Sequence, residues 1–281
     1  MDGEAPRQTA VTAAEVLRLV EGERPNRFSD TVAVEEPLEV RLGGKPATVI
    51  MRTPSPAGDA ELARGFLFTE GLITSADDIA EIRRPEGLKP EEVGNVVDVT
   101  LAPRLVQLRP RSVERNFYAT SSCGVCGKAS LQAIEVHAAR VTSDLRVARA
   151  VLLELPERLR MAQAAFDLTG GLHAAALFDA AGTLLALRED VGRHNAVDKL
   201  VGWALQAGHV PASRLVLMVS GRTSFEILQK AAMAGIPLLC AVSAPSSLAI
   251  SLADRMGITL VGFLRGQSMN VYAHPGRIEH A

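Results

Sequence analysis

The sequence predicts an α/β protein with a mixed, mainly parallel sheet sandwiched by helices, and a smaller N-terminal α+β section. The main observation is the regular second half, where apolar runs of strand length alternate with segments of helical periodicity. Such alternation is typical of β-α-β crossovers and of a sheet covered on both faces. A second observation is the pair of apolar runs on either side of Asp179-Ala-Ala-Gly182, which indicates a hairpin. The hairpin makes the sheet mixed.

The first half divides into a polar start and an α+β section. Residues 1–28 are polar, and we expect a disordered or loosely attached tail there. Residues 29–122 form the N-terminal α+β section, with Gly43-Gly44 as the turn of a hairpin. The pattern predicts strands at 31–42, 47–52 and 95–101 and a helix at 60–70. The section ends in a long basic loop that contains Arg109, Arg111 and Arg115.

The second half, residues 123–281, is predicted to be an α/β domain with the cysteine pair at its start. The predicted strands are at 172–178, 184–187, 215–219, 238–242 and 259–263. The predicted helices are at 194–207, 223–234 and 246–256.

Composition excludes several classes of protein. The 30 Lys and Arg nearly balance the 32 Asp and Glu, so no bulk attraction to nucleic acid or to an anionic membrane follows. The chain opens without a basic region that leads into an apolar run, and no stretch reaches the apolar length of a bilayer span. Three cysteines, an odd number, argue against a disulfide framework. We therefore expect a cytoplasmic protein that binds neither membrane nor nucleic acid.

The cysteine pair is the first candidate site. Cys123 and Cys126 flank Gly124-Val125, and Gly127 follows, so the loop bends easily and presents sulfur without obstruction. Arg115 and Lys128 are cations close in sequence that favour a reactive thiolate. A lone C-x-x-C is compatible with a dithiol redox pair, half of a zinc site, two buried small residues, or sulfur transfer.

Neighbouring residues weaken two of these alternatives. A zinc site needs further ligands, but there is no second C-x-x-C, and Cys240 lies inside an apolar run and is expected in the core. We therefore expect no metal site. A zinc deaminase is excluded, because no histidine precedes Cys123. A dithiol oxidoreductase is disfavoured, because its pair usually lies at a strand-to-helix turn with an aromatic residue or a proline inside or beside it, whereas this pair lies mid-chain in a polar loop.

Three predicted strand-to-helix turns form the second candidate site. Small residues allow a ligand close to the backbone, free N–H groups at a helix start attract anions, and arginines add charge-assisted bonds. The candidate residues are Gly192, Arg193 and His194 in the first turn, Ser220, Gly221, Arg222 and Thr223 in the second, and Ser243 in the third. Helix capping is the alternative explanation for each turn. Because two arginines recur, the sequence favours a phosphate site; His194 and His173 are equally compatible with structural roles.

Together these motifs resemble the FdhD family of formate dehydrogenase accessory sulfurtransferases. The resemblance rests on Ser122-Cys-Gly-Val-Cys-Gly-Lys128, Thr169-Gly-Gly-Leu-His-Ala-Ala175, Glu189-Asp-Val-Gly-Arg-His-Asn-Ala-Val-Asp-Lys199, Ser220-Gly-Arg-Thr-Ser-Phe-Glu226, Ser243-Ala-Pro-Ser-Ser247 and Gly262-Phe-Leu-Arg-Gly266. It extends from about residue 30 to the end of the chain. It implies a homodimer whose larger domain, at 123–281, has a cytidine-deaminase-like fold without deaminase chemistry.

The resemblance also implies a mechanism and partners. A cysteine desulfurase passes persulfide sulfur to Cys123, with Cys126 as its partner in receiving or relaying sulfur. The sulfur then goes to the molybdenum (or tungsten) bis-guanine-dinucleotide cofactor, bound as cargo, before that cofactor enters the catalytic subunit of formate dehydrogenase. A guanine nucleotide is expected to mimic the cofactor.

The family's cofactor-binding stretch falls on Phe263, Leu264, Arg265, Gly266, Gln267 and Ser268. Two competing functions remain: a non-catalytic cofactor carrier or chaperone, and a dithiol oxidoreductase. The order in which the two cysteines act stays open.

Overall fold

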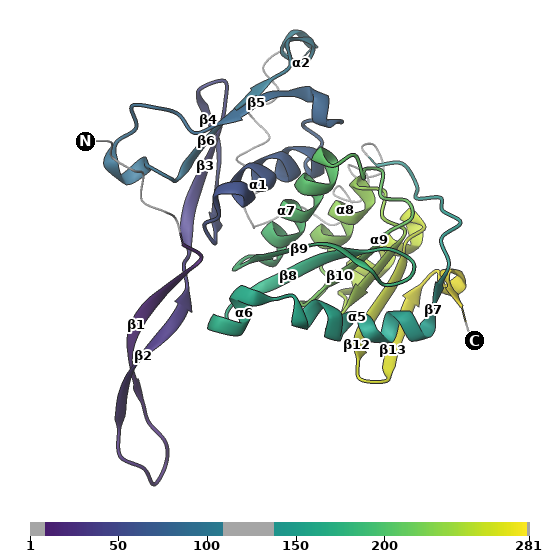
Figure 1. The fold of residues 1–281 in the computed structure, drawn as a ribbon. Helices are drawn as coiled ribbons and strands as arrows, with labels where there is room; N and C mark the ends of the chain where they lie inside the picture. Colours follow the sequence, from purple (N-terminus) through teal and green to yellow (C-terminus); the bar gives the residue numbers. More distant parts are fainter. Residues whose placement is uncertain (1–8, 109–137, 280–281) are drawn as a thin grey trace.

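The computed structural model describes residues 9–108 and 138–279, which form a six-stranded sheet, a four-stranded sheet, a two-stranded ribbon and a short two-stranded sheet (Figure 1). The larger sheet has the strand order β13-β12-β11-β10-β8-β9. Its strands are β8 (His173–Phe178), β9 (Leu184–Asp190), β10 (Val216–Val219), β11 (Leu238–Ala241), β12 (Thr259–Arg265) and β13 (Ser268–Ala273). The helices between them are α7 (Arg193–Gln206), α8 (Phe225–Met233) and α9 (Ser247–Met256). The predicted strands and helices of this region are confirmed.

The larger sheet is mixed, as predicted, but it is not mainly parallel. Only the pairs β10–β11 and β11–β12 are parallel, whereas β8–β9, β8–β10 and β12–β13 are antiparallel. The crossover through α7 does connect two strands of the same direction, β9 and β10, but β8 lies between them. The alternation of strands and helices along the sequence does not predict that β8 lies between β9 and β10, because tertiary packing decides which strands are neighbours.

Helices cover both faces of the larger sheet, as predicted. Leu217 and Val219 belong to one buried cluster together with residues of α1, α7, α8 and α9. Val216 and Met218, which alternate with them, belong to a second cluster with α5 (Arg149–Met161). Figure 1 shows α7 to α9 on one side of the sheet and α5 on the other. A strand that is buried on both faces must be apolar throughout, which explains the continuous apolar runs in the sequence.

The N-terminal section is a four-stranded sheet with the order β4-β3-β6-β5. Its elements are β3 (Glu36–Leu42), β4 (Lys45–Arg52), α1 (Pro56–Thr69), β5 (Ile79–Arg83) and β6 (Val96–Leu101). Gly43 and Gly44 both have positive φ, 56° and 82°, which suits a tight hairpin turn and confirms the predicted one. Strand β5 was not predicted. Ser55 caps the start of α1, because its Oγ accepts a hydrogen bond from the Gly58 N–H at 3.3 Å.

Disorder, one of the two alternatives predicted for the N-terminal tail, is wrong for residues 11–28, most of which lie in two paired strands. Strands β1 (Val11–Arg18) and β2 (Asn26–Ala33) pair antiparallel, and the ribbon extends away from the rest of the molecule (Figure 1). Val16 lies opposite Phe28, and the Arg18 guanidinium lies 5.1 Å from the Phe28 ring. Because a projecting ribbon buries little surface, its composition stays polar and is easily mistaken for that of a tail. Residues 1–8 lie outside the described residues.

The two sheets are joined where α1 crosses α7. A Cβ atom on Gly65 would lie 1.8 Å from the Asp198 carbonyl oxygen, and one on Gly202 would lie 1.9 Å from the Glu61 carbonyl oxygen. Only glycine permits this approach of two backbones. The buried cluster around α7 accordingly includes Leu38 and Val97 from the smaller sheet.

The remaining elements are short. They are the helices α2 (Pro103–Leu108) and α6 (Ala164–Thr169), the strands β7 (Val147–Ala148) and β14 (Ile278–Glu279), and single 3-10 turns at Ala76–Asp78, Pro90–Glu92 and Pro275–Arg277. Within 9–108 and 138–279, no helix has the length and apolarity needed to cross a membrane.

Candidate functional site

Three turns gather at one edge of the larger sheet. Strands β9, β10 and β11 all end at this edge, because β8 runs antiparallel to both β9 and β10 while β10 and β11 are parallel. We name the following segments turn one (191–195), turn two (220–224) and turn three (242–246). Ligands of open α/β sheets usually bind beyond such strand ends.

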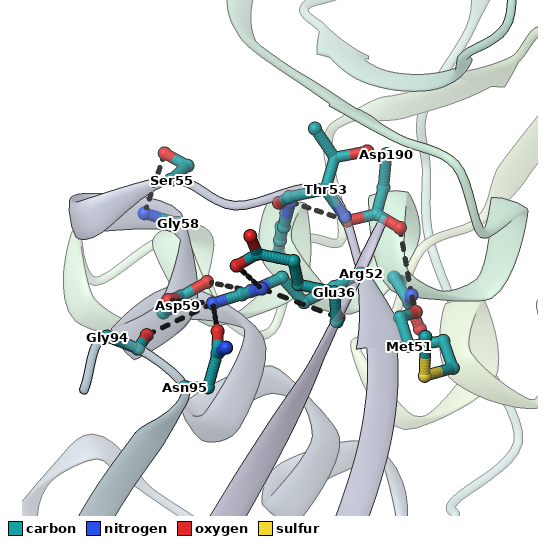
Figure 2. A network of polar contacts seen from close by, with 12 residues as sticks. Glu36, Met51, Arg52, Thr53, Ser55, Gly58, Asp59, Gly94, Asn95 and Asp190 are labelled. Carbon is teal, nitrogen blue, oxygen red and sulfur yellow. Dashed lines mark hydrogen bonds and ion pairs between the residues drawn. The ribbon is translucent and has the colours of Figure 1, made fainter. Parts of the chain in front are cut away.

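Turn one is fixed by a buried carboxylate that sequence reasoning missed. Asp190 is fully buried, and its Oδ1 accepts hydrogen bonds from the Gly192 N–H and from the Asn195 side chain, both at 2.8 Å. Its Oδ2 accepts from the Thr53 N–H at 3.1 Å and lies 2.6 Å from the Lys199 Nζ. Asp190 therefore ties turn one to the segment between β4 and α1 (Figure 2). The signal in the sequence was a lysine, Lys199, among the apolar residues of a predicted helix.

The segment between β4 and α1, which contacts Asp190 through Thr53, is fixed in place by a buried ion pair. The Arg52 guanidinium donates to both carboxylate oxygens of Asp59, at 2.8 and 3.0 Å, and neither side chain is exposed. The same guanidinium donates to the Asn95 Oδ1 at 3.0 Å, so it connects β4, α1 and the start of β6 (Figure 2). Bidentate arginine–carboxylate pairs fix orientation as well as distance. The backbone of Met51 and Thr53, beside Arg52, is thereby held against turn one.

Turns one and two meet through the imidazole of His194, and a second imidazole, His173, feels the charges of both turns. The His194 Nε2 lies 3.1 Å from the Ser224 Oγ. Burial, followed by the charges of Arg193 and Lys230, lowers the pKa of His194 to about 4. His173, at the start of β8, has a pKa lowered by burial and then by the charges of two arginines of the turns, Arg193 and Arg222. Both rings are therefore neutral at pH 7, and the guanidinium groups supply the positive charge.

Turns two and three form one continuous backbone surface with β12. Thr223 exchanges hydrogen bonds with turn three: its N–H donates to the Ala244 carbonyl at 3.2 Å, and its carbonyl accepts from the Ser246 N–H at 3.0 Å. The Phe263 N–H donates to the Ser243 carbonyl at 3.1 Å. We call the surface made by the three turns and Gly262-Phe263 the edge stripe. The structure thus brings the sequence-predicted turns together.

Helix capping explains only part of the edge stripe. The Ser246 side chain caps α9 by accepting from the Ala249 N–H at 3.2 Å. Ser224 precedes α8 without such a bond and contacts His194 instead, and the N-cap of α7 is Gly192, which has no side chain. The Ser220 Oγ accepts from the Ala174 N–H at 2.9 Å and so holds turn two against β8.

Two buried polar atoms of the edge stripe lack a partner within the described part of the chain. They are the Arg193 Nε and the Oγ1 of Thr223, whose exposed fraction is only 1%. An unsatisfied buried donor costs roughly 1–3 kcal/mol. An anionic group at this edge would satisfy them, and Arg222 is exposed nearby. The residues present fit a phosphate-bearing ligand.

The residues from Phe263 to Ser268 differ in exposure: Leu264 is buried, Phe263 is half-buried and the last four are exposed. Leu264 is fully buried in the cluster with α5, so its side chain faces away from the edge stripe, and its part in cofactor binding stays a prediction. Strand alternation is the reason, because neighbouring side chains point to opposite faces. Phe263 is half-buried with a positive φ of 51°, and the Arg265 guanidinium lies 5.5 Å from its ring. The exposed residues at the tip of the β12–β13 hairpin are Arg265, Gly266, Gln267 and Ser268.

The cysteines separate into two groups. Cys123 and Cys126 lie outside the described residues. Cys240 is fully buried in β11, as predicted, and burial raises the pKa of its thiol well above the usual range. Across 9–108 and 138–279, no group of three or more His, Cys, Asp and Glu side chains is arranged to hold a metal ion.

Comparisons with known proteins agree on one family. A sequence model of the FdhD/NarQ family matches residues 33–279. The sulfur carrier protein FdhD of Streptomyces avermitilis is 56% identical over 268 residues, covering 94% of each chain. That of Mycobacterium tuberculosis is 55% identical over 258 residues, covering 89% of this chain and 92% of the relative.

A solved structure gives the same result. A protein of Desulfotalea psychrophila, described as a formate dehydrogenase accessory protein, superposes with a TM-score of 0.74 at 25% identity, covering 96% of this chain and all of the other. The family model spans most of the chain and includes the whole edge stripe. This chain therefore belongs to the FdhD/NarQ family.

Proposed function

We propose that this protein is a sulfur carrier for formate dehydrogenase. It accepts persulfide sulfur from a cysteine desulfurase on Cys123 and transfers it to a molybdenum (or tungsten) bis-guanine-dinucleotide cofactor, which is cargo. The observation that carries the proposal is the edge stripe. There the buried Arg193 Nε and Thr223 Oγ1 have no hydrogen-bond partner among the described residues, and Arg222 is exposed nearby, so an anion would bind favourably. The name of the relatives, sulfur carrier protein, supports the transfer. The proposal includes a cytoplasmic homodimer.

The proposed chemistry has a balanced first step. The Cys123 thiolate attacks the outer sulfur of the donor's persulfide, a new S–S bond forms on Cys123, and the old S–S bond breaks to leave a donor thiolate. No external oxidant is needed. Cys126 is then available to receive or resolve the persulfide. The acceptor is held by its phosphates on the edge stripe, because backbone N–H groups and arginines bind phosphate well.

Mass spectrometry tests the sulfur step. The intact protein is incubated with a cysteine desulfurase and cysteine, and wild type is compared with Cys123→Ala and Cys126→Ala. Cys240→Ala is the matched control, because this thiol is fully buried. We expect a reducible gain of one sulfur atom in wild type and in the control, and none in Cys123→Ala. No gain in wild type, with an active desulfurase, would favour a non-catalytic carrier.

The competing functions differ in the role of the second cysteine. A carrier that only holds the cofactor still supports formate oxidation after Cys123→Ala. A dithiol oxidoreductase turns over a Cys123–Cys126 disulfide with a thioredoxin-like reductant and loses all activity in either single variant. Formate dehydrogenase activity in cells that carry Cys123→Ala therefore separates the non-catalytic carrier from the other two, and turnover with a thioredoxin-like reductant identifies the oxidoreductase.

Nucleotide titration tests the binding step. GDP serves as a mimic of one half of the cofactor, and pyrophosphate serves as its anionic part. We expect Arg222→Gln to weaken both ligands by about tenfold, which corresponds to one lost charge-assisted hydrogen bond. Arg149→Gln is the control, since Arg149 is exposed at the start of α5, on the other side of the sheet.

A further inference from the structure

Three arginines gather at the end of α9 that lies away from the edge stripe. The helix begins after turn three and ends at Gly257, so its ten residues separate the two places by about 15 Å. The Arg277 Nη1 donates to the Gly257 carbonyl at 2.8 Å, and a Cβ atom on the same glycine would lie 3.3 Å from the Arg140 Nε. Arg146 belongs to the group because its charge acts on Arg277. We call Arg140, Arg146 and Arg277 the arginine cluster.

The pairing of two short strands places Arg146 beside Arg277. Strands β7 and β14 are parallel, and Val147 pairs with Ile278, so the residues that precede these two are neighbours as well. Figure 1 shows β7 next to the C-terminal segment. Like charges on neighbouring strands repel each other. The pKa of Arg277 is accordingly lowered, first by burial and then by the charge of Arg146. The fold therefore holds two positive charges together against their repulsion.

The nearby carboxylates do not neutralise the arginine cluster. Within 9–108 and 138–279, none of its guanidinium groups forms an ion pair with a carboxylate at 4.0 Å or less. Asp254, in the last turn of α9, lies 3.6 Å from the His274 Nε2, and Asp144 pairs instead with Arg214 at 3.3 Å. The cluster is thus a local positive surface on a chain whose net charge is −2.

Capping of α9 explains only part of the arginine cluster. An arginine at the end of a helix interacts favourably with the last carbonyls, and the bond from Arg277 to Gly257 is of this kind. The Arg277 Nε, however, is buried without a hydrogen-bond partner among the described residues. Arg146 donates to the carbonyl of the adjacent Leu145 at 3.0 Å, and both Arg146 and Arg140 are exposed. Most of the donors therefore remain available to a ligand.

We infer that the arginine cluster is a docking surface for an acidic segment of a protein partner. Guanidinium groups bind carboxylates through paired hydrogen bonds, and a carboxylate between Arg146 and Arg277 would relieve their repulsion. The three arginines come from separate segments of the chain, so a ligand with several linked carboxylates fits them better than a single anion. Because the edge stripe lies at the opposite end of α9, a phosphate-bearing ligand and the protein partner can be bound at the same time.

Fluorescence anisotropy of the full chain with a fluorescein-labelled hexaglutamate peptide tests the docking surface. We expect Arg146→Gln and Arg140→Gln each to weaken the peptide by about tenfold, which corresponds to one lost charge-assisted interaction. Arg24→Gln is the matched control, because Arg24 is exposed in the turn between β1 and β2, and this variant should bind as tightly as wild type. Urea unfolding of Arg146→Gln adds a second readout. Since the substitution removes a repulsion, the unfolding free energy should stay unchanged or rise.

Four results would overturn the docking surface. Equal weakening in Arg24→Gln and Arg146→Gln would show an attraction to charge without a site. Displacement of the peptide by an equimolar concentration of inorganic phosphate would show a site for a free anion. A larger effect of Arg222→Gln than of Arg146→Gln would place the peptide on the edge stripe. A lower unfolding free energy in Arg146→Gln would show that this arginine serves the fold. None of these results bears on the sulfur step, which mass spectrometry tests separately.

Discussion

Asp190 gives the sharpest prediction about how turn one is held. Its carboxylate is fully buried, accepts three hydrogen bonds and lies 2.6 Å from the ammonium of Lys199, whose side chain is only 2% exposed. Asp190→Asn keeps the shape but removes the charge, and it leaves the Lys199 ammonium buried beside a neutral amide. The change keeps the packing volume, and it removes the charge together with the hydrogen bonds accepted by the oxygen that becomes an amide NH2.

The expected loss follows from the geometry. Breaking a buried ion pair by removing one partner costs about 3–5 kcal/mol, because the remaining charge is left without compensation. A typical domain has about 5–15 kcal/mol of stability, so the loss is a large fraction of the total. The double variant Asp190→Asn/Lys199→Met removes the stranded charge as well. We expect it to be more stable than Asp190→Asn by at least about 1 kcal/mol.

Urea unfolding followed by fluorescence provides the assay. The single tryptophan is Trp203, on α7 one turn beyond Lys199, so its signal reports on this helix. Asp144→Asn is the control: Asp144 pairs with Arg214 at 3.3 Å, but both side chains are more than 70% exposed, and the expected loss is under about 1 kcal/mol. A loss below about 1 kcal/mol in Asp190→Asn, or a double variant less stable than it, would refute the reasoning.

Three further outcomes are expected. Gly202→Ala places a Cβ atom 1.9 Å from the Glu61 carbonyl oxygen, so α1 and α7 must separate. The unfolding free energy measured in urea should therefore fall by at least about 1–3 kcal/mol. Gly276→Ala is the control, because its Cβ atom would lie in open space and should leave the unfolding free energy unchanged. In a variant without Cys123 and Cys126, Cys240 does not react with a thiol reagent until guanidinium unfolds the protein, because burial raises the pKa of its thiol; labelling before unfolding would contradict this. The pKa of His194 is about 4 in the fold against 6.5 ordinarily, so the unfolded chain binds a proton first and the unfolding free energy falls as pH drops from about 6.5 to about 4. His194→Gln should flatten that dependence in urea melts, and an unchanged slope would contradict it.

The second half was predictable because its signals are local. The run at 215–219 is apolar at every position since β10 is buried on both faces, and the helix at 194–207 carries its own periodicity. The turns that join them were recognised by small residues and arginines, and the sheet direction brings them to one edge. The first half was less predictable. The polar sequence at 11–28 forms β1 and part of β2 because the two strands pair with each other. Such pairing leaves no alternating apolar pattern in the sequence from which the strands could be predicted.

Several features of the candidate site depended on the tertiary structure. The importance of Asp190 appears only when β4 and α1 place the Thr53 backbone beside it, 137 residues away in sequence. The arginine cluster at the other end of α9 depends on it as well, because β7 and β14 come from distant parts of the chain.

The sequence by itself determined the order of the elements, the phosphate-like turns, the buried Cys240 and the family resemblance, because each is written in neighbouring residues. Only the tertiary structure decided that β8 separates β9 from β10, that Leu264 faces the core, and which polar atoms remain without a partner. These outcomes depend on contacts between segments far apart in the chain. Such contacts are selected by close packing and by pairing of buried polar groups, which no single segment specifies.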